Sequence, residues 1–144
     1  MENYLWLVYA LLSAVAAAMV SVFGKIGLQG LDAHTATAVR AVIMAAFLAA
    51  VAVFQRRWEH LPELWADKRA MTFILLSGVA GALSWLFYFT ALKYGKVSQV
   101  ALVDKLSVVL AATAAVVFLH ETVSVMSAAG IGLITAGIIL VALG

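Results

Sequence analysis

The sequence predicts an all-α membrane protein with five transmembrane helices, and composition, segment length and charge placement support this. Of its 144 residues, 66% are hydrophobic and only 11% are charged, against about 25% charged in ordinary soluble domains. Apolar stretches recur along the whole chain, each close to the ~20 residues that cross a bilayer. We therefore expect one transmembrane domain in the lipid bilayer over residues 1–144, with helices at about 3–24, 33–54, 70–92, 97–119 and 122–143.

The first two predicted spans differ in where their charges fall. Residues 3–24 carry no charge, and Lys25 closes that span. In the second span only 15 uncharged residues separate Arg40 from Arg56, which is too few to cross a hydrocarbon core. Arg40 is therefore drawn inside the membrane. Two interpretations stay open for it: its side chain extends to the near interface, or it has a specific buried partner.

The third predicted span, residues 70–92, has one face of small and polar residues that becomes aromatic towards its end. Gly81, Trp85 and Tyr88 share this face at helical spacing. One interpretation is helix packing on small residues, with aromatic side chains at the interface. The other is a cavity wall, where Trp85 and Tyr88 contact a substrate.

The fourth predicted span contains two adjacent charges, Asp104 and Lys105. The uncharged run after them has 14 residues, or roughly 21 Å of helix, against a hydrocarbon core of ~30 Å. Both charges must lie within the bilayer, where each costs about 2.5–3.5 kcal/mol. Adjacent helix residues do not face each other. We therefore expect no ion pair between them, and a separate partner or aqueous cavity for each; Ser107 lies beside the face of Asp104.

The remaining segments have structural interpretations. Residues 55–69 form a polar connection in which Trp58 and Trp65 share one helical face, as in a short helix at the membrane interface. The fifth span carries a Gly132–Ala136 pair of small residues, which favours close helix contact, including contact between subunits.

The charges of different spans fall at a common depth. Arg40 and Asp104 each lie 7 residues after the start of a predicted span, and Trp85 lies 7 before the end of one, which is roughly 10 Å below the same surface. This predicts a polar layer in which Arg40 and Asp104 are direct or water-bridged partners. The predicted substrate-binding or coupling residues are Arg40, Trp85, Tyr88, Asp104, Lys105, Lys25 and Ser107.

Several short motifs resemble the EamA domain of the drug/metabolite transporter superfamily. They are Ala91–Gly95 with Ser98 and Val100, then Phe118–Glu121, then the glycine-rich last helix, with Lys25 and Arg40 at the family's usual places. The resemblance implies one half of an inverted-repeat fold and transport of small metabolites by alternating access. Two features depart from it: one five-helix unit instead of two, and charges midway along the fourth span.

These observations predict a secondary transporter or facilitator of a small polar or amphipathic metabolite. The basic excess of the polar layer suits a carboxylate, and Asp104 is alternatively a proton-coupling group. The alternative is a non-transporting membrane assembly subunit whose charges serve helix association. An enzyme is not expected: the chain has no cysteine, and Ser124 stands where a second histidine would complete a zinc motif after His120–Glu121. We expect no cofactor, bound metal or nucleic-acid partner.

The distribution of basic residues between the connections predicts an unusual assembly. Four lie on the amino-terminal side of the membrane, Arg56, Arg57, Lys68 and Arg69, against three on the other, Lys25, Lys93 and Lys96. Orientation follows such an excess, so 4 against 3 permits insertion both ways. We expect an antiparallel homodimer, with a parallel dimer as the main alternative, in the cytoplasmic membrane of a bacterium or archaeon.

Overall fold

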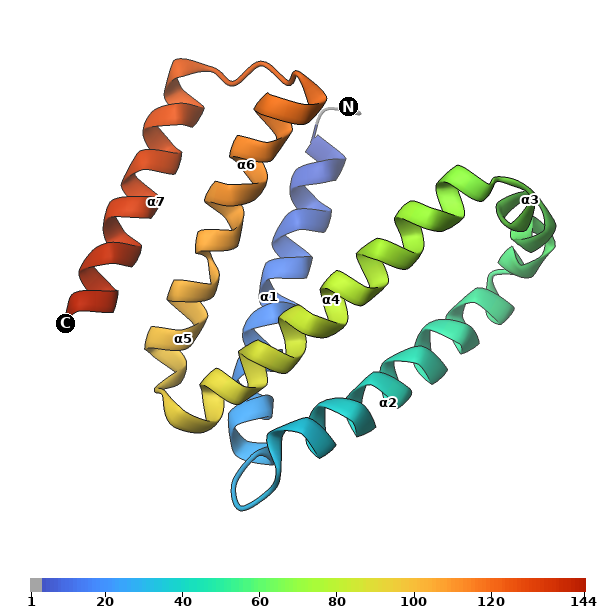
Figure 1. Ribbon diagram of the computed structural model, residues 1–144, viewed down its shortest axis with the longest axis horizontal. Coiled ribbons are helices and arrows are strands. Elements are labelled where there is room, and N and C mark those ends of the chain that lie inside the picture. The colour runs from blue at the N-terminus through green and yellow to red at the C-terminus, as the bar shows by residue number, and fades with distance from the viewer. Residues whose placement is uncertain (1–3) are drawn as a thin grey trace. The chain divides into compact units, whose positions relative to one another are not determined.

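The computed structural model describes residues 4–144, which form an all-helical protein in two compact units (Figure 1). One unit contains the first helix as far as Val22 together with Tyr94–Gly144, and the other runs from Phe23 to Lys93. Within the described residues, five helices are long and apolar enough to cross a membrane. The predicted fold class is therefore confirmed. The expected start of the first helix at residue 3 lies outside the described residues.

The unit Phe23–Lys93 is built on a helical hairpin. It begins with the end of α1 (Leu5–Gly27) and continues through α2 (Ala33–Phe54) to α4 (Lys68–Tyr94). The short helices η2 (Arg57–His60) and α3 (Leu61–Ala66) connect α2 to α4, which run alongside one another in Figure 1. The polar connection is thus two short helices in series instead of the single interfacial helix expected.

Capping side chains set the ends of the membrane helices. Asp32 precedes α2, and its Oδ2 accepts hydrogen bonds from the Thr35 backbone N–H at 2.8 Å and the Thr35 hydroxyl at 3.0 Å. Asp67 accepts from the N–H groups of Arg69 and Ala70, both at 3.0 Å, so α4 starts at Lys68 and not at the first uncharged residue. Such bonds satisfy N–H groups that a helix leaves without intrahelical partners.

The Asp32 cap makes the stability of α2 depend on pH. The hydrogen bonds from the Thr35 backbone and hydroxyl lower the pKa of this carboxyl below its usual 3.8. A lowered pKa adds stability that is complete above the unfolded pKa and is lost as the pH falls through the folded one. We expect Asp32→Ala to lower the melting temperature at pH 7, with the difference from wild type closing below about pH 4. Asp32→Asn is the control, because asparagine caps a helix without titrating. If Asp32→Ala lowered the melting temperature equally at pH 7 and below pH 4, this prediction would be contradicted.

The other unit pairs the fourth and fifth spans. Here α5 (Val97–Asp104) and α6 (Leu106–Leu119) pack on α7 (Val125–Leu143), which runs beside them in Figure 1. Ser124 caps α7 by accepting the N–H of Ser127 at 3.1 Å, so the fifth helix starts three residues later than expected. The fourth span is interrupted at Lys105, which belongs to neither helix.

The interruption at Lys105 overturns one prediction from the sequence. Lys105 Nζ lies 3.5 Å from Asp104 Oδ2, so the adjacent charges do form an ion pair. The Lys105 N–H bonds the carbonyl of Leu102, three residues back, and the Lys105 carbonyl accepts from Val108, both at 3.0 Å. The expectation assumed an ideal continuous helix. At this tightened turn, the long lysine side chain reaches back to the preceding carboxylate.

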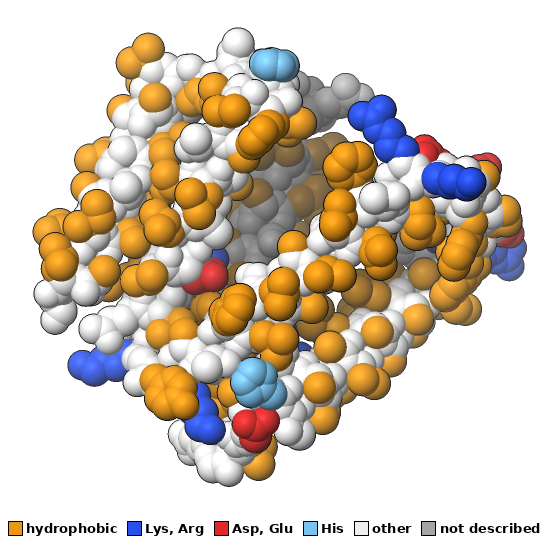
Figure 2. Space-filling model, viewed as in Figure 1, with side chains coloured by type: hydrophobic (Ala, Val, Ile, Leu, Met, Phe, Trp, Pro, Cys, Tyr) orange, Lys and Arg blue, Asp and Glu red, His pale blue; other side chains and the backbone are white. Residues whose placement is uncertain are grey.

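The surface of the molecule matches a lipid environment. Figure 2 shows hydrophobic side chains over the long helices, with most charged side chains near helix ends. The small described core lies mainly in the unit Phe23–Lys93, where Tyr88, Phe89 and Leu92 of α4 are 8%, 3% and 0% exposed. The Phe89 ring lies so close to α1 that a Cβ at Gly24 would approach its Cε1 to 2.9 Å. The absence of a side chain at Gly24 therefore lets α1 and α4 meet.

Candidate functional site: a groove with a stacked arginine

A groove of about 520 Å³ runs between α2 and α4. Residues one helical turn apart along α2 form one wall, including Thr37, Arg40, Met44 and Leu48. The α4 wall is formed mostly by small residues and ends in an aromatic side chain, with Gly78, Gly81, Ala82 and Trp85. The groove is thus largely apolar, with one guanidinium on its wall.

Arg40 is the centre of this site. Its Cζ lies 3.7 Å from the centroid of the Trp85 ring and 5.1 Å from that of Phe89. A guanidinium stacked on an aromatic face gains about 0.5–1 kcal/mol at exposed sites and about 2 kcal/mol when desolvated. Of the two interpretations of Arg40, the structure favours a specific partner, and that partner is an aromatic face. This contact brings Arg40 and Trp85 together, as their common expected level suggested; the depth of that level in the membrane stays a prediction.

Trp85 is held in place by its own helix. The Tyr88 ring meets it edge-on, with centroids 5.7 Å apart and an interplanar angle of 85°, and the Phe89 ring lies at the same centroid distance. Edge-to-face geometry places the positive ring edge against the negative face of the neighbour. Tyr88 is buried and is not among the residues that line the described groove. It positions Trp85, while direct contact with a substrate remains a prediction.

The glycines of α4 open the groove instead of permitting tight packing. A Cβ built at Gly78 or Gly81 would meet no atom within 4 Å. Between closely packed helices such an atom would meet the neighbouring helix, as it does at Gly24. Gly78, Gly81 and Trp85 of this face line the groove; contact of Trp85 and Tyr88 with a substrate stays a prediction.

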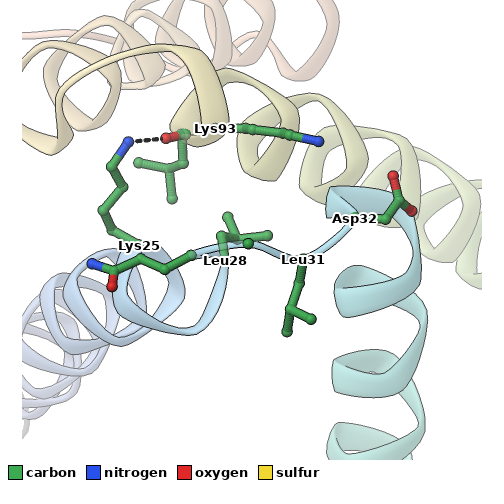
Figure 3. A pocket seen from close by; sticks show the side chains of 8 residues that line it. Lys25, Leu28, Leu31, Asp32 and Lys93 are labelled. Atoms are coloured by element: carbon green, nitrogen blue, oxygen red, sulfur yellow. Dashed lines mark hydrogen bonds between the residues drawn. The ribbon is translucent and has the colours of Figure 1, made fainter.

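The other predicted site residues are not among those that line this groove. Lys25 lines a different cavity, at the turn between α1 and α2, and donates a hydrogen bond to the Leu92 carbonyl at the end of α4 (Figure 3). Asp104, Lys105 and Ser107 belong to the unit that contains α5 and α6. The ion pair there leaves Lys105 51% and Asp104 35% exposed by side chain. The pairing of Arg40 with Asp104 stays a prediction.

Sequence reasoning missed part of the groove. Thr37, Met44 and Leu48 were not singled out, although each lies three to eight residues from Arg40 along α2. Applying the helical period from the intramembrane charge would have found them. Phe89, the second ring near Arg40, gave no comparable signal, because a phenylalanine in an apolar span is ordinary.

The comparisons with known proteins agree with this architecture. Residues 4–143 match the EamA-like transporter family. The chain is also 39% identical over 137 residues to an uncharacterized transporter in the cobO 3'region of Sinorhizobium sp, a match that covers 95% of this chain and 96% of that protein. No solved structure shows a significant match to the chain.

The fold and the matches place the chain in a class, multi-pass membrane proteins of transporter type. The chain belongs to the EamA-like transporter family.

Proposed function

We propose that the protein is a secondary transporter or facilitator of a small amphipathic metabolite that carries an anionic group such as a carboxylate. The observation that carries this is the Arg40 guanidinium, stacked at 3.7 Å on Trp85 in an otherwise largely apolar groove. An intramembrane cation is costly and is retained where it serves binding or transport. Guanidinium matches carboxylate geometry through paired N–H donors, while the apolar walls accommodate the rest of the molecule.

The proposed cycle is alternating access, with Arg40, Asp104 and Lys105 forming the polar layer. The ion pair of Asp104 and Lys105 supports transport over the assembly-subunit alternative, because two charges that pair within the chain do not require a partner subunit. Asp104 is alternatively a proton-coupling group, with Lys105 as its neighbour. The similarity to an uncharacterized transporter of Sinorhizobium supports the same class of activity. The proposed location is the cytoplasmic membrane of a bacterium or archaeon.

The test is a screen of metabolites against detergent-purified protein by thermal shift, followed by uptake into proteoliposomes. Small monocarboxylates with an apolar body are expected to raise the melting temperature, whereas matched amides and amines are not. The screen is repeated on Asp104→Asn, which keeps the shape but removes the charge. A transporter shows saturable uptake; a partner subunit that co-purifies at a fixed ratio, with no uptake, would instead indicate the assembly role.

We further propose that the working form is an antiparallel homodimer, because many transporters pair two inverted repeats around one site and this five-helix unit corresponds to one such repeat. The near balance of basic residues, four against three, permits dual insertion. Reporters fused at Gly144 are expected to be active on both sides of the membrane. Adding two lysines to one connection should move the signal to one side. A reporter restricted to one side that stays there after Arg56 and Arg57 are neutralised would contradict dual insertion and favour a parallel dimer.

A further inference from the structure

A second cavity, of about 490 Å³, lies where the α1–α2 turn meets the carboxyl end of α4. Leu28 and Leu92, 5% and 0% exposed, are buried residues of its lining, and Gln29 and Gly30 contribute from the turn. It is separate from the groove of Arg40, with which it shares no lining residue.

The charges of this cavity come from three helix ends. Lys25 comes from the last turn of α1, Lys93 from the end of α4, and Asp32 from the cap of α2. Figure 3 shows Lys25 bonded to the Leu92 carbonyl on one side and Lys93 extending towards Asp32 on the other. Two ammonium groups and one carboxylate give the cavity a formal net charge of +1.

The cavity lies at the membrane surface. Membrane helices α1 and α4 end here at Gly27 and Tyr94, and α2 begins here at Ala33, so the turn that joins them falls at the depth of lipid headgroups. Leu31, which lines the cavity, and Ile26, which follows Lys25 in the chain, are 58% and 60% exposed. They offer apolar surface to the part of a ligand that continues into the hydrocarbon.

We propose that this cavity binds the phosphodiester headgroup of an anionic phospholipid, between the ammonium groups of Lys25 and Lys93. Lysine binds phosphate as a point charge. The net charge of +1 complements the single negative charge of a phosphodiester, and the Asp32 carboxylate disfavours a phosphomonoester, which carries about −1.5 to −2 at pH 7. Neighbouring Leu31 contacts the glycerol and upper acyl chain, which a free phosphate lacks.

The experiment is native mass spectrometry of the detergent-purified protein titrated with lipids, with thermal shift as a second readout. Phosphatidylglycerol is expected to bind more tightly than phosphatidic acid, and both more tightly than phosphatidylcholine. Lys93→Gln should weaken phosphatidylglycerol binding about fivefold, since a lysine near an anionic lipid contributes about 1 kcal/mol. Lys96→Gln, on the same side but outside the cavity lining, is the matched control and should leave binding unchanged.

Two further measurements test the role of Asp32 and whether the bound phosphate belongs to a lipid. Asp32→Asn keeps a helix-capping side chain and should shift the preference towards phosphatidic acid. Inorganic phosphate and glycerol phosphate should compete poorly; competition equal to that of phosphatidylglycerol would overturn the lipid as the source of the phosphate. Equal weakening by Lys93→Gln and Lys96→Gln would overturn the cavity itself, because a diffuse surface charge would explain it. Lys93→Gln carries the test, since Lys25→Gln also removes the hydrogen bond to the end of α4.

Discussion

Replacing Arg40 with methionine is expected to abolish transport and to weaken binding of an anionic ligand about 10- to 150-fold, the effect of losing a hydrogen bond to a charged group worth about 1.5–3 kcal/mol. Methionine keeps an unbranched apolar side chain, so the groove between α2 and α4 retains its shape. The ligand affinity and transport of Arg40→Lys should lie between those of wild type and Arg40→Met, because lysine keeps the charge but loses the planar stacking on Trp85 at 3.7 Å. Binding is measured by titration calorimetry and transport by uptake into proteoliposomes.

The control for Arg40 is Arg57→Met, which removes a cation from the polar connection, outside the groove. It should leave ligand affinity at the wild-type value. Full affinity and uptake in Arg40→Met would remove the observation on which the proposed function rests. Loss in both Arg40→Met and Arg57→Met would show that general basicity matters and not the stacked guanidinium.

Filling the groove from α4 should stop transport without unfolding the protein. A Cβ at Gly81 meets nothing within 4 Å, so the backbone accepts a side chain there and Gly81→Leu projects it into the space that a substrate would occupy. Leucine is also a better helix former than glycine, by up to ~1 kcal/mol. We expect uptake to be lost, while the melting temperature stays equal to that of wild type or rises. Gly81→Ala should reduce uptake less.

The matched control for Gly81 is Gly137→Leu in α7, where a Cβ also meets nothing within 4 Å and the glycine is outside the groove. Its uptake should equal that of wild type. Normal uptake by Gly81→Leu would mean that the substrate does not pass between α2 and α4. A strongly lowered melting temperature would mean that Gly81 packs more closely than the structure describes.

Much of the fold could be predicted because the length of each apolar stretch, and the charges between the stretches, indicate where membrane helices lie. The second helix begins at Ala33 and the fourth span at Val97, as expected, whereas the first and third helices continue past their expected last residues, 24 and 92, to Gly27 and Tyr94. The third and fifth helices start at different residues from those expected because Asp67 and Ser124 cap them, and the length of a hydrophobic run does not reveal a cap.

The site was predictable in part for a similar reason. Counting residues from the span ends placed Arg40 and Trp85 at the same expected depth, since the rise per residue is fixed in a helix. Which side chain an intramembrane charge meets depends on helix rotation and rotamer, which depth does not determine. We expected an opposite charge as the partner of Arg40, and the sequence therefore did not indicate the aromatic face that contacts it. The same limit applied to Asp104 and Lys105, where an ideal helix predicted divergence and a tightened turn produced contact.

The interruption at Lys105 has a mechanical consequence for the fourth span. A continuous helix bends only by straining many backbone hydrogen bonds in series, whereas two shorter rods joined at one residue pivot about a single pair of dihedral angles. Here the rods are α5 and α6, and the pivot coincides with the only acid–base pair inside a span of the described residues. An ion that binds beside this junction would compete with the ion pair of Asp104 and Lys105 and would therefore act directly on the geometry of the tightened turn.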